Sequence, residues 1–402
     1  RKEPINDLNG YYIIGTDSIY PNNVLMSYDL NTGTKEKLSP DSLHIRNISI
    51  SDDNKNIALT VSPGSYPDYE IKTEVYLLNL ENKEFKKLTN NNIIEKSISW
   101  SKDSKKIYFL SDANVKQEFY YQHKLFYIDI DSGKTGILDS NFNYEINSYF
   151  HKEGTDNFYS LVNMGVKQNL FYYTNGRWEQ LTRLNAFIRY FVYDSKRDLI
   201  FCSISTSDKT DDIYILNKKG EIVRQVTFIN PLLSNFILSK SKVIKWKSND
   251  GKFVEGIVYF PIKYDSSKKY PLVIQLHGGP AASFTLQFQG DYNSYAHVLA
   301  GKGFFVFQPN YRGSTGYGDE WMREILGHYF EKDVDDVITG INYLAHEWLI
   351  DTNKIVIHGW SAGAHLTNWI VTHFHYFKAA SAYAGMCDWI SLYNTSEIKY
   401  LR

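Results

Sequence analysis

The chain has 402 residues, with 44 Lys and Arg against 45 Asp and Glu, so its formal net charge is −1. This balance excludes the strongly basic surface that nucleic-acid binding usually needs, and no run of about 18 apolar residues is present to cross a membrane. Two cysteines, Cys202 and Cys387, are too few for a disulfide framework or a cysteine-built zinc site. The aromatic content of 16% predicts much β-structure.

A repeated pattern occupies the first 240 residues. Each copy has a strand that ends near an Asp or Asn, then a polar turn, then a short step that resembles Leu-Thr. About four short strands per copy is typical of a β-propeller blade. We therefore predict about five blades of an incomplete propeller in residues 1–240, in preference to a sandwich with regular hairpins. The step recurs every 43 to 50 residues, at Leu38-Ser39, Leu88-Thr89, Leu138-Asp139, Leu181-Thr182 and Val226-Thr227.

The pattern changes near residue 240, and residues 241–402 alternate between strand and helix signals. Such alternation predicts an α/β layer with a mostly parallel sheet. Short apolar runs predict strands that are buried on both faces, whereas spacings of three and four residues predict helices. The expected strands are Val243–Trp246, Phe253–Phe260, Leu272–Leu276, Phe304–Phe307, Ile355–Ile357 and Ala379–Tyr383, and the expected helices are Asp333–Trp348 and Ala362–Phe374.

The segment Gly359-Trp360-Ser361-Ala362-Gly363 follows one of these strands and opens a helix. That context is the one a nucleophile elbow needs, because a serine on a sharp strand-to-helix turn is presented at the edge of the sheet. The helix N-terminus also favours negative charge that develops nearby. A plain Gly-rich turn is the alternative, and the strand and helix on either side favour the elbow.

A second turn, His277-Gly278-Gly279-Pro280, directly follows the predicted strand Leu272–Leu276. In α/β-hydrolases a loop at this place supplies one backbone N–H to the oxyanion hole, and the residue after the nucleophile, here Ala362, supplies the other. Glycine lets the backbone approach a substrate oxygen closely. We expect His277 itself to be an orienting, hydrogen-bonded histidine and not a catalytic base.

The segment Asn310–Gly318 is rich in glycine but is not a phosphate loop. It lacks the Gly-Lys-Ser/Thr ending and does not open directly into a helix. We expect its Arg312 to form a structural ion pair with Asp333, Asp335 or Asp336.

Together, in this order, the segments at 277–280, 310–321 and 359–363 resemble the prolyl oligopeptidase family of serine peptidases, most closely its acylaminoacyl peptidase branch. The resemblance is dense from Val243 to Arg402. It implies a Ser-Asp-His hydrolase beneath a propeller that admits peptides and excludes folded proteins. Carried over by position, Ser361 is the nucleophile, and Gly279 and Ala362 donate the oxyanion-hole N–H groups.

Two positions depart from the family pattern. His277 stands where the dipeptidyl-peptidase branch has an oxyanion-hole tyrosine, which argues against that branch. Ala364 stands where a glycine usually follows the elbow, and this change is minor because alanine is also small.

The acid and base of the triad are expected after the serine in α/β-hydrolases, yet only about 40 residues follow Ser361. His365, His373 and His375 lie on or beyond the following helix, where a side chain rarely reaches the serine oxygen. Asp388 could mimic a triad acid, but we expect it to cap a helix. The chain begins with Arg1 and not Met. We therefore expect a piece cut from a longer enzyme at both ends, inactive by itself, with the triad Asp and His beyond Arg402.

The function predicted for the complete protein is that of a serine peptidase that hydrolyses oligopeptides or acyl-peptides through an acyl-enzyme on Ser361. A carboxylesterase on the same scaffold, or a propeller binding module with a degenerate hydrolase domain, are the alternatives. We expect no cofactor and no metal. The expected partner is a peptide or acyl-peptide substrate, with no nucleic acid and no membrane segment. The oligomeric state is left open. The location is also left open between the cytoplasm and the periplasm or secretion from the cell.

Overall fold

The structure is a computed structural model, and it describes all residues except 1–4, 7–11, 14–20, 153, 291–294 and 396–402. Two compact units divide the chain. The first unit comprises residues 1–140, 154–156 and 393–402, and the second comprises residues 141–153 and 157–392. The predicted change of pattern near residue 240 falls inside the second unit, where blade-like strands give way to a six-stranded sheet.

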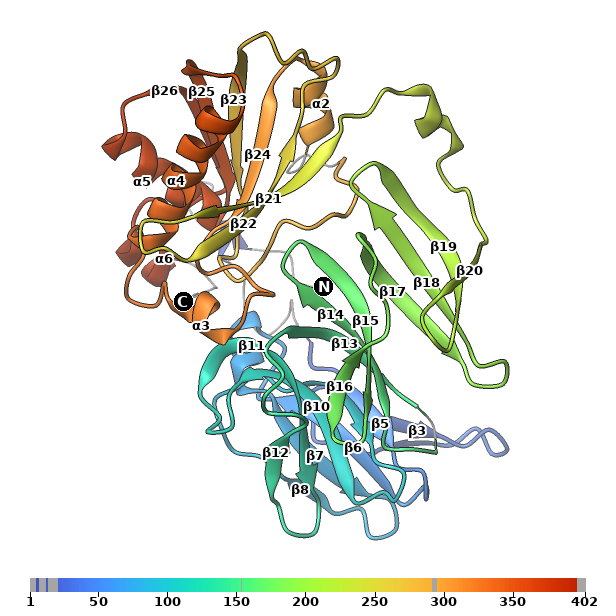
Figure 1. Cartoon of the computed structure of the whole chain (residues 1–402). Helices are drawn as coiled ribbons and strands as arrows, with labels where there is room; N and C mark the ends of the chain where they lie inside the picture. The colour runs from blue at the N-terminus through green and yellow to red at the C-terminus, as the bar shows by residue number, and fades with distance from the viewer. Residues whose placement is uncertain (1–4, 7–11, 14–20, 153, 291–294, 396–402) are drawn as a thin grey trace. The chain divides into compact units, whose positions relative to one another are not determined.

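The first unit consists of antiparallel sheets (Figure 1). Among the described residues, two of them have four strands, and two two-stranded sheets precede these. The strands are β1 (Ile5–Asn6), β2 (Tyr12–Ile13), β3 (Met26–Tyr28), β4 (Lys35–Lys37), β5 (His44–Ile50), β6 (Asn56–Ser62), β7 (Glu74–Asn79), β8 (Phe85–Lys87), β9 (Lys96–Trp100), β10 (Lys106–Ala113), β11 (Phe119–Asp129) and β12 (Thr135–Ile137), with a 3-10 helix, η1 (Pro67–Lys72), between β6 and β7.

The two four-stranded sheets of this unit pack face to face. Ala58 and Val75 of the earlier sheet share one apolar cluster with Trp100 and Phe109 of the later one. The indole Nε1–H of Trp100 also donates to the carbonyl oxygen of Ser49, at 2.8 Å. Each sheet thus buries one face on its neighbour, as propeller blades do.

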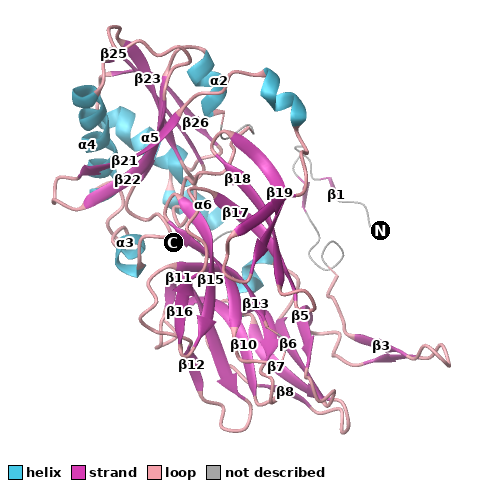
Figure 2. Ribbon diagram, turned by 45° about the vertical axis from the view of Figure 1, so that its right-hand side comes forward, coloured by secondary structure: helices cyan, strands magenta, loops and turns pink. Residues whose placement is uncertain are grey.

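The second unit begins with eight further strands of the same kind, shown as magenta arrows in Figure 2. They form two four-stranded blades that a single parallel contact, Gln168 to Phe187, joins into one sheet. The strands are β13 (Glu145–His151), β14 (Phe158–Met164), β15 (Lys167–Thr174), β16 (Arg177–Gln180), β17 (Phe187–Asp194), β18 (Leu199–Thr206), β19 (Lys209–Asn217) and β20 (Ile222–Gln225).

The structure explains the recurring Leu-Thr step. In four of the five copies the hydroxyl of its second residue accepts a hydrogen bond from a backbone N–H of the preceding strand or of the residue just before that strand, a contact that we term the hydroxyl clasp. A hydroxyl suits this place because it accepts from a backbone N–H that the ladder leaves unpaired. The clasps run from Leu25 to Ser39 at 2.8 Å, from Val75 to Thr89 at 2.8 Å, from Leu170 to Thr182 at 2.9 Å and from Ile213 to Thr227 at 2.8 Å.

All five predicted repeats are present as hairpins, and four of them belong to four-stranded blades. The first repeat shows only its outer hairpin, β3 and β4, and most of residues 1–20 lie outside the described residues.

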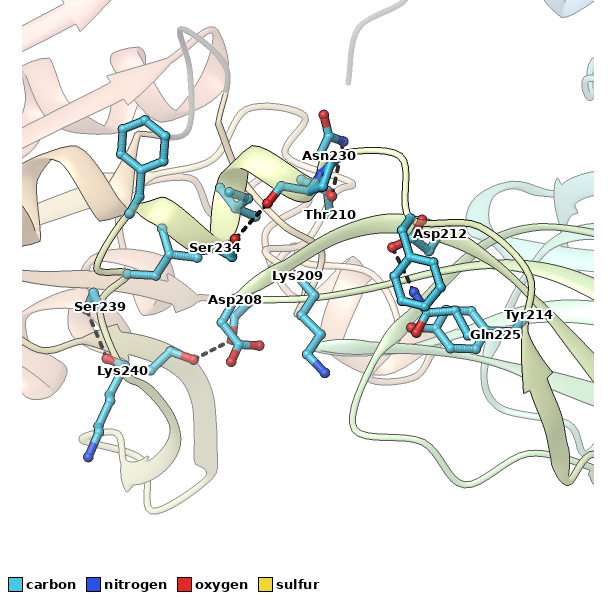
Figure 3. A pocket seen from close by; sticks show the side chains of 17 residues that line it. Asp208, Lys209, Thr210, Asp212, Tyr214, Gln225, Asn230, Ser234, Ser239 and Lys240 are labelled. Carbon is cyan, nitrogen blue, oxygen red and sulfur yellow. Dashed lines mark hydrogen bonds between the residues drawn. The ribbon is translucent and has the colours of Figure 1, made fainter.

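A connecting segment with the short helix η2 (Pro231–Asn235) leads from the last blade to the six-stranded sheet. It covers a pocket of about 690 Å³ (Figure 3). Asn230 bonds Thr210 across the pocket, and Gln225 bonds Asp212. The pocket shares no lining residue with the turns at 277–280 and 359–363.

The remaining strands form one sheet in the order β21-β22-β24-β23-β25-β26. The last four strands in that order run parallel, whereas β21 and β22 are antiparallel additions. This confirms the predicted α/β-hydrolase region. Its elements are β21 (Ser241–Lys247), β22 (Phe253–Tyr259), β23 (Tyr270–Leu276), α2 (Ala296–Gly301), β24 (Phe305–Asn310), α3 (Asp319–Arg323), α4 (Lys332–Glu347), β25 (Ile350–Trp360), α5 (Ala362–His373), β26 (Phe377–Tyr383) and α6 (Trp389–Thr395).

Both faces of this sheet are covered. Ile274, Phe307 and Ile357 are fully buried and pack with side chains of α4 and α5. On the other face, Val306 packs with Ala296 of α2. The apolar runs that predicted the strands therefore reflect burial on two sides. No helix in the described part of the chain is both long enough and apolar enough to cross a membrane.

Candidate active site

The two predicted turns lie at the same edge of the sheet. They follow β23 and β25, which are paired in parallel with Leu276 opposite Gly359. Because the carboxyl ends of parallel strands meet at one edge, this register brings the segments 277–280 and 359–363 together, the usual place for a site in an α/β protein.

Ser361 occupies a strained turn between β25 and α5. Its φ of 54° and ψ of −118° lie in a region that L-residues rarely adopt. Its N–H donates to the carbonyl oxygen of Tyr383 at 3.0 Å, and its own carbonyl oxygen accepts from Ala364 and His365 at 3.0 and 3.1 Å. The backbone on both sides therefore holds the serine in place.

The glycines of this turn are required by close backbone contacts. A Cβ on Gly359 would lie 2.2 Å from the carbonyl oxygen of Gly363. A Cβ on Gly363 would lie 2.4 Å from the carbonyl oxygens of both Leu276 and His277. Gly363 is therefore the point where the start of α5 touches the end of β23, and the spacing of the motif follows from these two contacts.

The second turn lies directly against the serine. A Cβ on Gly278 would be 3.1 Å from Cβ of Ser361. Among the described residues, neither the N–H of Gly279 nor that of Ala362 donates a hydrogen bond, and Gly279 is exposed while Ala362 is half-buried. Two backbone donors, one in each turn, thus have no hydrogen-bond partner among the described residues.

His277 is buried behind this turn. Its Nδ1 lies 2.8 Å from the carbonyl oxygen of Gly278, and its Nε2 lies 2.9 Å from Oγ of Ser314. The ring stacks on Tyr311 at a centroid distance of 4.4 Å and an angle of 6°, and the Tyr311 hydroxyl donates to the carbonyl oxygen of His277 at 2.6 Å. Burial lowers the pKa of His277 to about 4. These contacts agree with an orienting role and not with that of a base.

Arg312 is fully buried and forms the predicted pair with Asp336, while Asp333 and Asp335 are not its partners. Its Nε lies 2.9 Å from Asp336 Oδ2. Arg312 has two further carboxylate partners that the sequence did not indicate, Asp250 and Glu324, of which Glu324 is 3.1 Å away. The hydrogen bond from Arg312 is the main cause that lowers the pKa of Asp250.

Two of the residues that could have replaced the missing triad acid and base, His365 and Asp388, instead stabilise the fold. His365 is buried, and its ring packs edge-on against Phe330 and Trp389, at centroid distances of 4.7 and 5.2 Å. Asp388 accepts the N–H groups of Ile390 and Ser391 at 3.1 Å, so it caps α6 as expected.

His373 and His375 are largely exposed at the end of α5 and beyond it. Within the described residues, the Ser361 hydroxyl has no hydrogen-bond partner. The geometry therefore supplies a serine and two N–H donors, and no acid–base pair among the described side chains.

Comparison with known proteins finds a family match in the C-terminal part of the chain. Residues 291–402 match the model of the prolyl oligopeptidase family. The uncharacterized peptidase YuxL of Bacillus subtilis is 30% identical over 216 residues, which are 53% of this chain and 32% of that protein. The dipeptidyl-peptidase 5 of Porphyromonas gingivalis is 25% identical over 365 residues, which are 88% of this chain and 52% of that protein.

A solved structure agrees with these relatives. The acylaminoacyl peptidase of Pyrococcus horikoshii matches with a TM-score of 0.58 and 18% identity, over 94% of this chain and 75% of that one. The likeness confirms the fold, a propeller with an α/β-hydrolase domain. The chain spans about a third to a half of the length of the two curated relatives.

Proposed function

We propose that this chain, whose C-terminal region carries the prolyl oligopeptidase family domain, is the part of a serine peptidase that contains the nucleophile Ser361 and both oxyanion-hole donors. The observation that carries the proposal is the strained turn at Ser361, which holds the side chain beside the unpaired N–H groups of Gly279 and Ala362. A turn with no catalytic role has no reason to retain a strained serine next to two free donors.

The reaction follows from this arrangement. Oγ of Ser361 attacks the carbonyl carbon of the scissile bond while its proton passes to a histidine base. The carbonyl oxygen becomes negative and is stabilised by the two N–H groups, a contribution worth about 3–4 kcal/mol per donor. The tetrahedral intermediate expels the amine, which takes the proton from the histidine, and water then releases the acyl group from Ser361.

The base and its orienting acid are proposed to follow Ser361 in the chain order Ser, Asp, His. We place both beyond residue 402, because His365 and Asp388 are engaged in packing and capping. The chain of residues 1–402 alone is then expected to show no turnover.

The proposed substrates are oligopeptides or acyl-peptides. Two observations support a peptide substrate: the family match, and a named relative that is a dipeptidyl-peptidase. The blades that precede the hydrolase region in the chain fit a role in admitting short peptides.

Labelling with a serine-directed fluorophosphonate probe tests the nucleophile. The full-length protein should be labelled at Ser361, and Ser361→Ala should abolish both labelling and the hydrolysis of acyl-amino-acid and dipeptide p-nitroanilides. Ser381→Ala, which changes an exposed serine on the neighbouring strand β26, is the matched control and should react normally. Equal labelling of Ser361→Ala and the wild type would reject the proposal. Faster hydrolysis of p-nitrophenyl esters, with no cleavage of amides, would instead indicate a carboxylesterase.

A further inference from the structure

His277 is a buried polar side chain to which the reaction described above gives no task. It lies in the second turn, two residues before the proposed donor Gly279, and both of its ring nitrogens are within hydrogen-bond distance of a neighbour. The position of the ring proton therefore decides which of these contacts is attractive.

The neighbours of the ring show where that proton lies. The hydroxyl of Ser314 donates to the carbonyl oxygen of Tyr311 at 2.6 Å, and its oxygen lies 2.9 Å from Nε2 of His277. On the other side of the ring, the carbonyl oxygen of Gly278 lies 2.8 Å from Nδ1 and can only accept a hydrogen bond. The contact with Gly278 is therefore the one that requires a proton on the ring.

The neutral ring then carries its proton on Nδ1. In that tautomer Nδ1–H donates to the carbonyl oxygen of Gly278, 2.8 Å away. The opposite tautomer would place a nitrogen lone pair against this oxygen and would be repulsive. Because burial holds the ring neutral at pH 7, its single N–H proton lies on Nδ1, where the Gly278 oxygen accepts it.

This hydrogen bond fixes the oxyanion donor through the peptide plane. The carbonyl of Gly278 and the N–H of Gly279 belong to one trans peptide, so the two groups point in opposite directions. With the oxygen held by His277, the N–H is turned away from the histidine ring. Gly278 itself lies against Ser361. A peptide polarised at its oxygen is also a better donor at its nitrogen.

We propose that His277 is a positioning residue that orients and polarises the Gly279 N–H for the oxyanion. The inference deepens the proposed function and rests on it for its kinetic effect. A merely structural histidine would affect stability, whereas a positioning residue affects the transition state, so kcat falls while KM changes little.

Two substitutions of His277 test the contacts of its two ring nitrogens one at a time. In His277→Asn the side-chain amide can take the place of Nδ1–H and still bind Gly278, whereas in His277→Gln it reaches only the place of Nε2. Both variants lose the stacking on Tyr311, so they are matched. We expect kcat of the full-length enzyme to fall by about 100-fold in His277→Gln, comparable with the loss of one oxyanion donor, and by less than about tenfold in His277→Asn. KM should stay within about threefold in both.

Ser314→Ala removes only the contact at Nε2 and keeps the bond from Nδ1–H to Gly278, so its kcat should stay within about threefold of the wild-type value. His297→Asn, which changes a half-buried, hydrogen-bonded histidine on α2, should leave kcat unchanged. Equal kcat values in the Asn and Gln variants, or a loss that appears only in KM, would overturn the proposal.

Crystal structures of the two variants test the inference without any activity. The Gly278–Gly279 peptide should keep its orientation in His277→Asn and rotate or lose order in His277→Gln. An unchanged peptide in both variants would overturn the positioning role. If wild-type protein is neither labelled at Ser361 nor active, the proposed function fails, and the two peptide orientations still decide this inference.

Discussion

The two turns at the edge of the sheet reach their shapes by different routes. The turn at Ser361 is fixed by its own glycines, which bring residues 359 and 363 into backbone contact. The turn at His277 is held instead by Tyr311 and Ser314, which lie 34 and 37 residues further along the chain. The nucleophile is thus positioned locally, and the oxyanion donor depends on a loop that follows another strand.

The largest loss of stability is expected when a side chain is added at Gly363, where α5 touches the end of β23. Gly363→Ala places a methyl group 2.4 Å from two carbonyl oxygens that cannot move independently of β23. We expect the free energy of unfolding to fall by about 5 kcal/mol, with loss of labelling at Ser361. Gly278→Ala is the control from the other turn, where the nearest atoms lie at 3.0 to 3.3 Å. It should cost about 1 kcal/mol. Denaturant unfolding measures both values. Similar losses of unfolding free energy in the two variants would contradict the view that the Ser361 turn is packed more tightly than the His277 turn.

The next largest effect is expected from breaking the ion pair of Arg312 with Asp336, which holds the loop that follows β24. Arg312→Met leaves Asp336 buried without its cation, a change that typically costs about 3–5 kcal/mol. The double variant Arg312→Met, Asp336→Leu should recover much of this loss, because it removes the unpaired charge. Thermal unfolding of the single and double variants measures both values. A single variant as stable as the wild type would show that the pair does not hold this loop.

The smallest effect is a dependence on pH at His277. An unfolded histidine has a pKa near 6.5, whereas burial lowers it to about 4 in the folded protein. Between these values the unfolded state binds the additional proton, so stability is complete above pH 6.5 and is lost as the pH falls towards 4. The loss is up to about 3 kcal/mol.

His277→Asn lacks this ionisation. The difference in melting temperature between wild type and variant should therefore be larger at pH 7 than at pH 4.5. Other buried histidines titrate in both proteins and cancel in the difference. A constant difference across this range would contradict the burial of a neutral ring.

The sequence was sufficient where structure is set by nearby residues. The repeats, the buried strands and the turn at Ser361 all appear as local patterns, because strand alternation, turn chemistry and glycine contacts act over a few residues. The cap formed by Asp388 was predictable for the same reason.

The sequence could not predict hydrogen bonds and ion pairs between residues that are far apart in the chain. Asp250 looks like a turn residue, and nothing near it indicates Arg312, its partner 62 residues away. Ser314 carries no signal that it binds His277, since only the pairing of β23 with β24 brings their loops together. The ion pair with Asp336 was predictable only as one of three nearby carboxylates.

The hydroxyl clasp also bears on how such a chain can change in length. Each clasp closes a hairpin over 12 to 14 residues, and no two of these clasps share a residue, although Thr89 also donates to Glu95 in the segment that leads to β9. A whole repeat could therefore be duplicated or deleted without breaking any other clasp. Contacts such as that of Trp100 with Ser49 join one blade to the next. A change in the number of blades would therefore have to preserve the contacts between neighbouring faces.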